Sequence, residues 1–284
     1  METGEFALSD REFARVRERV YRIAGISLSD AKRTLVVSRL SRTLRILGLP
    51  SFDAYLDRLE HGADPEEQQN FINALTTNLT RFWREDHHFD HLAGEIRALM
   101  KRPVRLARDG RPRVRIWSAG CSTGQEPYTI AVDLLARVPE LKAADFKILA
   151  TDIDTAVLAK AAVGTYPEGE LNGLSKARIA MLERTVDGKV RIPAPARQAI
   201  SFKLLNLMDH PWPMKGPFDA IFCRNVAIYF DRPTQAQLFH RLGAMLAAEG
   251  HLYVGHSENV VADEFRLVGK TTYEYRPVRR RSAA

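Results

Sequence analysis

The fold of this chain is decided by residues 114–128, which read VRIWSAGCSTGQEPY. The stretch opens with a short apolar run of the kind that forms a buried strand. Six small residues, 119–124, follow and predict a tight turn where the backbone can approach a ligand closely. Pro127 suits the first turn of a helix, which we expect to continue over residues 129–136. A strand, a glycine turn and a helix in this order are typical of α/β folds that bind nucleotide-like cofactors.

The turn carries an acid and lacks the GxGxxG spacing of a pyrophosphate site. Glu126 would repel a phosphate, but it suits a ligand with ammonium, sulfonium or sugar hydroxyl groups. S-adenosylmethionine (SAM) has all three. The alternative interpretation is an ordinary strand-to-helix turn with an exposed acid.

Length and composition indicate a globular protein. The 284 residues are 45% hydrophobic and 27% charged, and they suffice for one large core or two modest ones. No apolar run approaches the roughly 20 residues of a membrane span, and the N-terminus lacks a secretory pattern. Cys121 and Cys223 are far apart in sequence and suggest no disulfide framework. A reduced, cytoplasmic location is therefore predicted.

The formal net charge of +7 is unevenly distributed. Residues 31–50 hold five Lys/Arg and no acid, and residues 97–115 hold eight Lys/Arg beside Asp109. The tail adds Arg276, Arg279, Arg280 and Arg281. Such patches indicate either an acidic partner, which could be nucleic acid or a protein surface, or simply a solvated face.

Residues 1–80 are predicted to form a small helical bundle, with helices over 9–24, 30–47, 51–59 and from 65 to about 75. The second helix is amphipathic, because its apolar residues recur at helical spacing. Its basic residues gather on the other side of the helix: Lys32, Arg39, Arg42 and Arg45. The bundle shows no catalytic set of its own.

The segment 78–84, NLTRFWR, combines polar and aromatic residues between the bundle and a helix expected over 85–100. Such linkers often contribute to ligand clefts. His87, His88 and His91 follow it. We predict no metal site there, because no third ligand is evident and no HExxH pattern occurs.

Strands and helices alternate over residues 112–276, which predicts a mostly parallel sheet. Strands are expected over 146–150, 200–204, 218–223, 251–255 and 272–276, with a helix over 234–248. Asp152 follows the second strand, where an acid grips the ribose of SAM or NAD, although it could also be a helix cap. Asp154 is expected to cap the helix over 155–162. Asp187-Gly188 predicts a β-hairpin over 184–192.

Polar residues Arg224 and Asn225 follow the strand over 218–223, where open α/β sheets bind ligands. A SAM-like cofactor is favoured over NAD because of the acid-flanked turn. A nucleic-acid methyltransferase would explain the basic patches, but CRNVAIYFD lacks the Pro-Pro-aromatic turn of enzymes that methylate base amines. Other nucleic-acid targets and a non-enzymatic binding module stay open.

At these residues the chain resembles the CheR family of chemotaxis protein-glutamate methyltransferases. The matching segments are TTNLTRFWRE, IWSAGCSTGQEPYTIA, ATDIDTAVLAKA, FDAIFCRNVAIYFD and GHLYVGHSEN. The resemblance implies a SAM-dependent enzyme that esterifies glutamate side chains on the cytoplasmic helices of chemoreceptors and releases S-adenosylhomocysteine. It implies no nucleic-acid partner and no membrane insertion, and a monomer is the default. The alternatives are a SAM-binding module that acts on another acidic protein or nucleic acid, and a non-catalytic receptor-binding protein.

The implied architecture is a Rossmann-like SAM-dependent methyltransferase domain over 111–284, with an all-helical N-terminal domain over 1–80. Residues 81–110 would form a linker and the first helix of the catalytic domain. A small β insertion is expected at about 184–200. It looks short for docking a receptor-tail peptide, so we expect a peptide-independent enzyme.

The resemblance also implies roles for individual residues. The cofactor would be contacted by Asn78, Thr80, Arg84, Glu126, Asp152, Asn206, Leu207, Arg224 and Asn225. Within this set, Glu126 would take the methionine amino group, Asp152 the ribose, and Asn206 with Leu207 the adenine. Gln125 stands where the family commonly has an acid, which leaves Glu126 as the only acid of that pair.

Tyr229 would lie at the methyl-transfer region and could hold the attacking carboxylate, or it could be a packed aromatic. Arg224 could brace its loop instead of touching the ligand. The basic residues Arg39, Arg42 and Arg45 would face the acidic methylation helices of a receptor.

Overall fold

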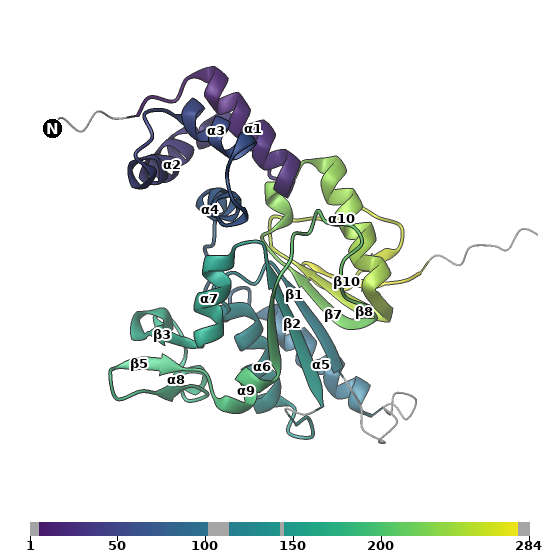
Figure 1. Cartoon of the computed structure of the whole chain (residues 1–284). Coiled ribbons are helices and arrows are strands. Elements are labelled where there is room, and N and C mark those ends of the chain that lie inside the picture. Colours follow the sequence, from purple (N-terminus) through teal and green to yellow (C-terminus); the bar gives the residue numbers. More distant parts are fainter. Residues whose placement is uncertain (1–5, 102–113, 143–144, 278–284) are drawn as a thin grey trace, which may run out of the picture.

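Four helices at the N-terminus pack together in a computed structural model, which describes residues 6–101, 114–142 and 145–277 (Figure 1). They are α1 (Asp10–Ala24), α2 (Arg33–Leu47), α3 (Phe52–His61) and α4 (Pro65–Leu75), with a 3₁₀ turn η1 (Asp30–Lys32) before α2. Polar caps begin three of them: the side chains of Ser9, Ser51 and Asp64 each accept a hydrogen bond from a first-turn N–H. The four predicted helices are confirmed.

A seven-stranded sheet forms the centre of the molecule, in the order β6-β2-β1-β7-β8-β10-β9. Its strands are β1 (Val114–Ala119), β2 (Phe146–Asp152), β6 (Ile200–Leu204), β7 (Phe218–Cys223), β8 (Leu246–Val254), β9 (Phe265–Leu267) and β10 (Thr272–Tyr275). The first five are parallel, and β10 pairs antiparallel with both β8 and β9. Because β1 pairs with β2 on one side and β7 on the other, the chain reverses direction across the sheet at β1, which is where α/β folds bind ligands.

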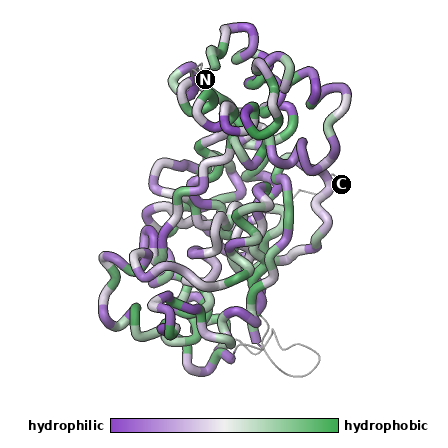
Figure 2. The backbone as a smooth tube through the Cα atoms, turned by 60° about the vertical axis from the view of Figure 1, so that its left-hand side comes forward, coloured by the Kyte–Doolittle hydropathy of each residue, from purple (hydrophilic) through white to green (hydrophobic). Residues whose placement is uncertain are grey.

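Both faces of the sheet are buried, because successive side chains of a strand point to opposite faces. Ile116 packs in one core with α5 (His87–Met100), α6 (Gln125–Arg137) and α9 (Ala194–Gln198). Its neighbour Trp117 packs in the other core, with α10 (Arg232–Met245) and α1 to α4. Figure 2 shows hydrophobic and hydrophilic stretches alternating along the backbone, in the bundle as well as around the sheet. The second core is continuous from the bundle to the sheet.

The structure corrects the boundary predicted at residue 248. Helix α10 ends at Met245, and residues 246–248 belong to β8, where Leu246 pairs with Phe218 across an irregularity in the ladder. Leu and Ala favour helices, but strand pairing overrides that weak local preference. Sequence analysis also missed β9, and it began the fifth core strand too late.

The predicted hairpin is confirmed but belongs to a second, three-stranded sheet. Strands β4 (Glu183–Arg184) and β5 (Lys189–Arg191) pair antiparallel, and β3 (Thr165–Pro167), which the sequence did not predict, pairs with the other edge of β5. Two short helices, η3 (Glu168–Leu171) and α8 (Lys176–Ile179), lie between β3 and β4 in the chain. Asp154 caps α7 (Thr155–Val163), as predicted.

Hydrogen bonds hold the bundle against the loops at the carboxyl ends of the parallel strands. Asn206 donates its side-chain N–H to the carbonyl of Ile23 (2.6 Å). The backbone N–H of Ser27 donates to the carbonyl of Tyr229 (2.8 Å), next to a β-bridge between Ile26 and Phe230. These contacts place the end of α1 beside the loops that follow β6 and β7.

The basic stripe of α2 differs from the prediction at one residue. Arg39 is half-buried and donates hydrogen bonds to the carbonyls of Ala74 and Thr76 at the end of α4, where it satisfies unpaired helix-end acceptors. Arg42 and Arg45 are exposed. Most of the basic segment 97–115 and the tail Arg279, Arg280 and Arg281 lie outside the described residues. Among the residues that are described, we find no helix both long and apolar enough to span a bilayer.

Candidate active site

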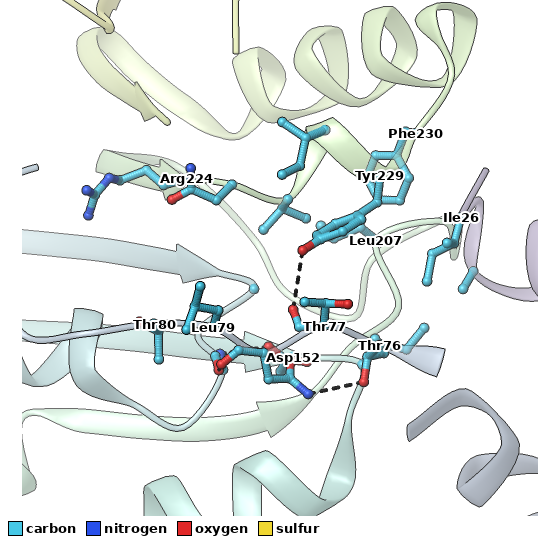
Figure 3. Close-up of a pocket in the computed structure, with 18 of the residues that line it drawn as sticks. Ile26, Thr76, Thr77, Leu79, Thr80, Asp152, Leu207, Arg224, Tyr229 and Phe230 are labelled. Carbon is cyan, nitrogen blue, oxygen red and sulfur yellow. Dashed lines mark hydrogen bonds between the residues drawn. The ribbon is translucent and has the colours of Figure 1, made fainter. Parts of the chain in front are cut away.

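A pocket of about 600 Å³ lies between the bundle and the carboxyl ends of the strands (Figure 3). This volume falls within the roughly 300–1,000 Å³ of typical small-molecule sites. One wall comes from the end of α1, η1 and the start of α2. The linker 75–84 and the loops after β1, β2, β6 and β7 form the other walls. Apolar side chains such as Ile26, Leu79, Leu207 and Phe230 alternate there with polar ones.

Asp152 joins two of these loops at the end of β2. Its Oδ2 accepts from the backbone N–H of Ser122 (2.7 Å), and its Oδ1 accepts from that of Asp154 (3.0 Å). Ser122 has a left-handed φ of 50°, which turns its N–H toward the acid. Burial raises the pKa of Asp152, although the two N–H donors act against this effect. Asp152 is therefore a fixed acceptor at the pocket floor and does not cap a helix.

Arg224 is a buried cation at the wall of the pocket, and its side chain is only 2% exposed. Its guanidinium lies 3.0 Å from Glu126 Oε2 and 3.3 Å from Glu85 Oε2, and it donates to the carbonyl of Arg84. Ser118 Oγ donates to the other oxygen of Glu126 (2.7 Å). Arg224 thus both braces its loop and lines the pocket, so the two predicted readings are compatible.

The pKa values of the two acids beside Arg224 are shifted in opposite directions. Burial raises the pKa of Glu126, with Arg224 and Ser118 acting against it. Burial acts on Glu85 in the same sense, but a hydrogen bond from His256 and the charge of Arg224 outweigh it and lower the pKa to about 2. Glu85 is a residue that sequence analysis missed, although it ends the quoted segment TTNLTRFWRE.

Glu258 holds the loop that follows β7. Its carboxylate accepts from four backbone N–H groups, those of Gly255 (2.6 Å), Asn225 (2.7 Å), Val226 (2.9 Å) and Ile228 (3.2 Å). Asn225 has a left-handed φ of 60°, and this bonding holds it there. Sequence analysis assigned Glu258 no role, although it belongs to the quoted GHSEN segment.

The linker is tied to both neighbouring loops. Asn78 donates its side-chain N–H to Asp154 Oδ2 (2.7 Å), and its carbonyl accepts from Ser122 Oγ (2.9 Å). Tyr229, on η4 (Ala227–Tyr229), directs its hydroxyl across the pocket toward the carbonyl of Thr77 at 3.5 Å (Figure 3). The linker and Tyr229 therefore face each other over the cavity.

All ten residues predicted for the site line this pocket: Asn78, Thr80, Arg84, Glu126, Asp152, Asn206, Leu207, Arg224, Asn225 and Tyr229. Their individual roles stay predictions. The side chain of Asn206 is engaged with Ile23 O and with the N–H of Met208 (3.0 Å), so it is held as a wall of the pocket. Sequence analysis missed the contribution of the bundle, including Ile26, Ser29 and Lys32.

The pocket suits a cofactor that carries an ammonium and a ribose. Two carboxylates reach it: the half-buried Glu126 from the first turn of α6, and the buried Asp152 from the end of β2. Gly120 has a φ of +80°, and a Cβ there would lie 2.3 Å from the side chain of Val226. The turn therefore requires glycine, which keeps this part of the floor free of side chains. An acid-lined crevice without a phosphate grip is the kind of site that a SAM-type methyltransferase uses.

Known proteins agree with this class. The family described as "CheR methyltransferase, SAM binding domain" matches residues 78–274, and "CheR methyltransferase, all-alpha domain" matches residues 11–76. The chain is 46% identical to chemotaxis protein methyltransferase 2 of Pseudomonas aeruginosa, over 95% of this chain and 94% of that protein. It is 43% identical to the chemotaxis protein methyltransferase of Escherichia coli, over 95% of this chain and 93% of that protein.

The chain therefore belongs to the CheR methyltransferase family. It is a SAM-dependent methyltransferase, and S-adenosylmethionine is its cofactor.

A histidine behind the site predicts how stability depends on pH. His88 is fully buried near Arg224, with Nε2 2.8 Å from Thr271 Oγ1. Burial, and then the charge of Arg224, lower its pKa from 6.5 to about 3. Between these values the unfolded chain binds a proton that the folded chain does not. We expect this histidine to reduce the free energy of unfolding as pH falls below 6.5, by up to about 1.4 kcal/mol per pH unit.

The measurement is urea unfolding of the wild type and of His88→Gln between pH 7 and pH 5. The stability of His88→Gln should fall less steeply with acidification, whereas the exposed-site control His240→Gln should follow the wild type. Parallel curves for the wild type and His88→Gln would contradict the prediction.

Proposed function

We propose that this enzyme transfers a methyl group from SAM to glutamate side chains of chemoreceptors, giving glutamate methyl esters and S-adenosylhomocysteine. The observation that carries the proposal is the pocket itself, in which an acid-lined cofactor site opens beside a helical bundle with exposed arginines. The names of the relatives, which refer to chemotaxis, support this choice of substrate. The acceptor would be the cytoplasmic helical domain of a membrane receptor.

The chemistry asks little of the enzyme beyond positioning. The cofactor supplies an electrophilic methyl group on a sulfonium. A glutamate substrate is already ionised near neutral pH, so the chain needs no strong general base. Glu126 and Asp152 would hold the cofactor, and Arg224 keeps Glu126 in place. Rate enhancement would then come mainly from orientation of the two reactants.

The test is methylation in vitro of a purified receptor cytoplasmic domain with methyl-labelled SAM. A glutamate methyl ester releases labelled methanol on mild alkaline treatment, whereas an N-methyl group does not. Receptor variants with the modified glutamates changed to alanine serve as the control. Alkali-stable label, or label that transfers equally to nucleic acid, would refute the proposal.

Tyr229 provides the first prediction for this reaction. Its hydroxyl would hold the substrate carboxylate, and one hydrogen bond to a charged group contributes about 1.5–3 kcal/mol. We expect Tyr229→Phe to lower the methylation rate about 10- to 100-fold while the dissociation constant for SAM stays within about twofold. The two quantities are measured by initial rates and by calorimetric titration. An unchanged rate would assign Tyr229 to packing alone.

The exposed arginines of α2 provide the second prediction. Lys32 and Leu35 line the pocket, and Arg42 lies on the same face of α2 further along the helix. This face therefore extends from the pocket outward along the surface of the bundle. Arg45 is exposed beside it. We expect Arg42→Glu with Arg45→Glu to lower kcat/KM for the receptor at least about tenfold, and to do so less at high salt, because surface charge mainly sets the encounter rate.

Binding of SAM should not change in this double variant. Arg39 is left intact, because its bonds to α4 make it structural. The matched control is Lys142→Glu with Lys270→Glu, two exposed lysines outside the bundle that give the same change in net charge. Equal effects of the two double variants would contradict a specific receptor contact.

The small sheet bears on a separate prediction, that this enzyme needs no receptor-tail peptide. Its edge strand β4 has two residues, and β5 has three. Addition of a peptide strand depends on a row of free backbone groups, which so short an edge offers poorly. This supports a peptide-independent enzyme, which stays a prediction.

A further inference from the structure

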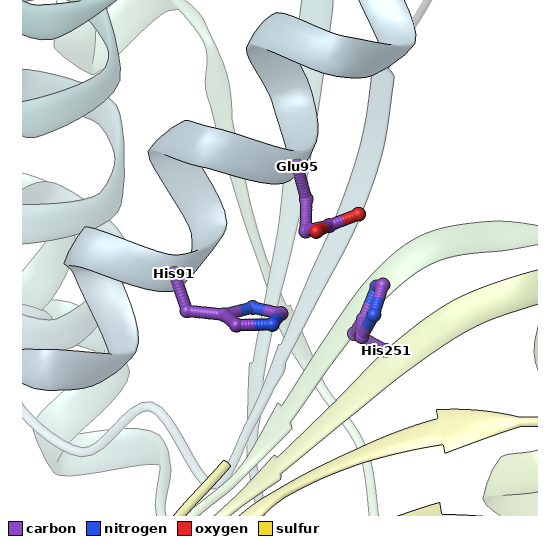
Figure 4. A group of neighbouring side chains, drawn as sticks. All are labelled: His91, Glu95 and His251. Carbon is purple, nitrogen blue, oxygen red and sulfur yellow. The ribbon is translucent and has the colours of Figure 1, made fainter. Parts of the chain in front are cut away.

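Two histidines and a glutamate from distant parts of the chain point toward one another on the α5 side of the sheet (Figure 4). His91 and Glu95 are four residues apart on α5, so they leave the same face of the helix. His251 comes from β8. One nitrogen or oxygen of each residue can be chosen so that all three atoms lie within 4.8 Å of one another. A histidine pair with a carboxylate is a donor set that binds zinc.

Sequence analysis predicted no metal here because it found no third ligand near His91. The structure supplies a candidate third residue, since the pairing of β8 beside β7 and β10 brings residue 251 under α5. His87 and His88, which were considered with His91 as metal ligands from the sequence, do not belong to this group. His88 is fully buried against Thr271.

One histidine is already oriented for a ligand. His91 Nδ1 lies 3.0 Å from the hydroxyl of Tyr253, whose ring is buried and stacked on Phe222 at 4.2 Å. This contact fixes the ring and leaves Nε2 as the nitrogen for a cation, as in metal sites where the second ring nitrogen is hydrogen-bonded.

There is room beside the cluster. A small cavity of about 40 Å³ is lined by Glu95 and His251, together with the acids Asp219 and Glu249. A single water needs roughly 10–15 Å³ of such space, so the cavity has room for a water that would complete the coordination of an ion from the side of Glu95 and His251.

We propose that His91, Glu95 and His251 bind one Zn²⁺ ion, in a site separate from the methyltransferase pocket. The ion would fasten α5 to β8. Both elements lead into the site described above, because α5 follows Glu85 and β8 runs into the turn that carries Glu258. The ion would thus stabilise the scaffold behind the pocket without touching the reactants.

The test uses the full chain without a polyhistidine tag, stripped with a chelator and then dialysed against ZnCl₂. We expect one zinc per chain and a thermal midpoint that rises with zinc. His251→Ala and Glu95→Gln should each weaken zinc binding at least about tenfold. Tyr253→Phe, which removes the contact that orients His91, should also weaken it by about tenfold. The control His240→Ala, at an exposed histidine, should bind zinc like the wild type.

Several results would overturn the proposal. One is a wild-type protein that retains well under one zinc per chain, and another is undiminished binding in His251→Ala. Competition between zinc and S-adenosylhomocysteine in calorimetry would place the ion in the cofactor pocket instead. If the variants fail to fold, the wild type with Co²⁺ decides. Intense visible absorption typical of four-coordinate cobalt supports the site, and a spectrum like that of aqueous cobalt refutes it.

Discussion

The substitution Asp152→Asn is expected to raise the dissociation constant for SAM at least about 100-fold. Asp152 uses its two oxygens to accept the N–H groups of Ser122 and Asp154. An asparagine offers one oxygen and one N–H₂ group, so one of these donors would face another donor. The charge that should hold the ribose is lost as well. Hydrogen bonds to charged groups contribute about 1.5–3 kcal/mol each, so loss of the bonds from the two ribose hydroxyls to the carboxylate accounts for the expected factor.

Calorimetric titration with SAM and with S-adenosylhomocysteine measures this effect. The matched control is Asp133→Asn. Asp133 is a buried acid on α6 that accepts a hydrogen bond from Trp83 Nε1 (3.1 Å) and does not line the pocket. The control should bind both ligands like the wild type. Retained affinity in Asp152→Asn would show that the ribose is held elsewhere.

The substitution Arg224→Met is expected to lower the free energy of unfolding by about 3–5 kcal/mol at pH 7, because it leaves two carboxylates that are only 12% exposed without their cation. Glu126 and Glu85 both lie within 3.3 Å of the guanidinium. The loop would also lose the bond to the carbonyl of Arg84. SAM binding should weaken at the same time, since Glu126 would no longer be held at the pocket wall.

Urea unfolding of the wild type, Arg224→Met and Arg224→Met/Glu126→Gln measures the loss. The double variant should recover part of it, because the second change removes a stranded charge. Arg266→Met is the exposed control: its partner Glu274 lies 2.7 Å away at the surface, and such pairs contribute at most about 1 kcal/mol. Equal losses in Arg224→Met and Arg266→Met would mean that burial of the first pair does not matter.

Sequence patterns predicted most of the sheet and the residues of the pocket. The strand-turn-helix at residues 114–128 is local, so its periodicity and its glycines are visible without a structure. The positions of Asp152, Arg224 and Asn225 at strand ends place them together because parallel strands end at one edge. The composition of the linker 78–84 pointed to a ligand cleft, but its individual contact residues, together with Asn206, Leu207 and Tyr229, came from the family resemblance, because no local pattern would select them.

What the sequence did not reveal depends on contacts between distant residues. Glu258 accepts hydrogen bonds from backbone N–H groups up to 33 residues away. The sequence around it does not indicate that its carboxylate is buried and hydrogen-bonded in this way. The sequence of residues 246–248 favours a helix, and only the pairing with β7 makes this segment a strand. The bundle's share of the pocket arises because the end of α1 docks on the loops after β6 and β7, which periodicity within α1 cannot show.

The docking of the bundle has a thermodynamic consequence. Asn206 and Ser27 join α1 and the segment after it to the loops of the sheet, and those same segments wall the pocket. A molecule in the pocket therefore touches both bodies at once and acts as a bridge between them. Such coupling is reciprocal: the factor by which bound cofactor would favour docking of the bundle equals the factor by which a docked bundle raises the affinity for the cofactor over that of an undocked one.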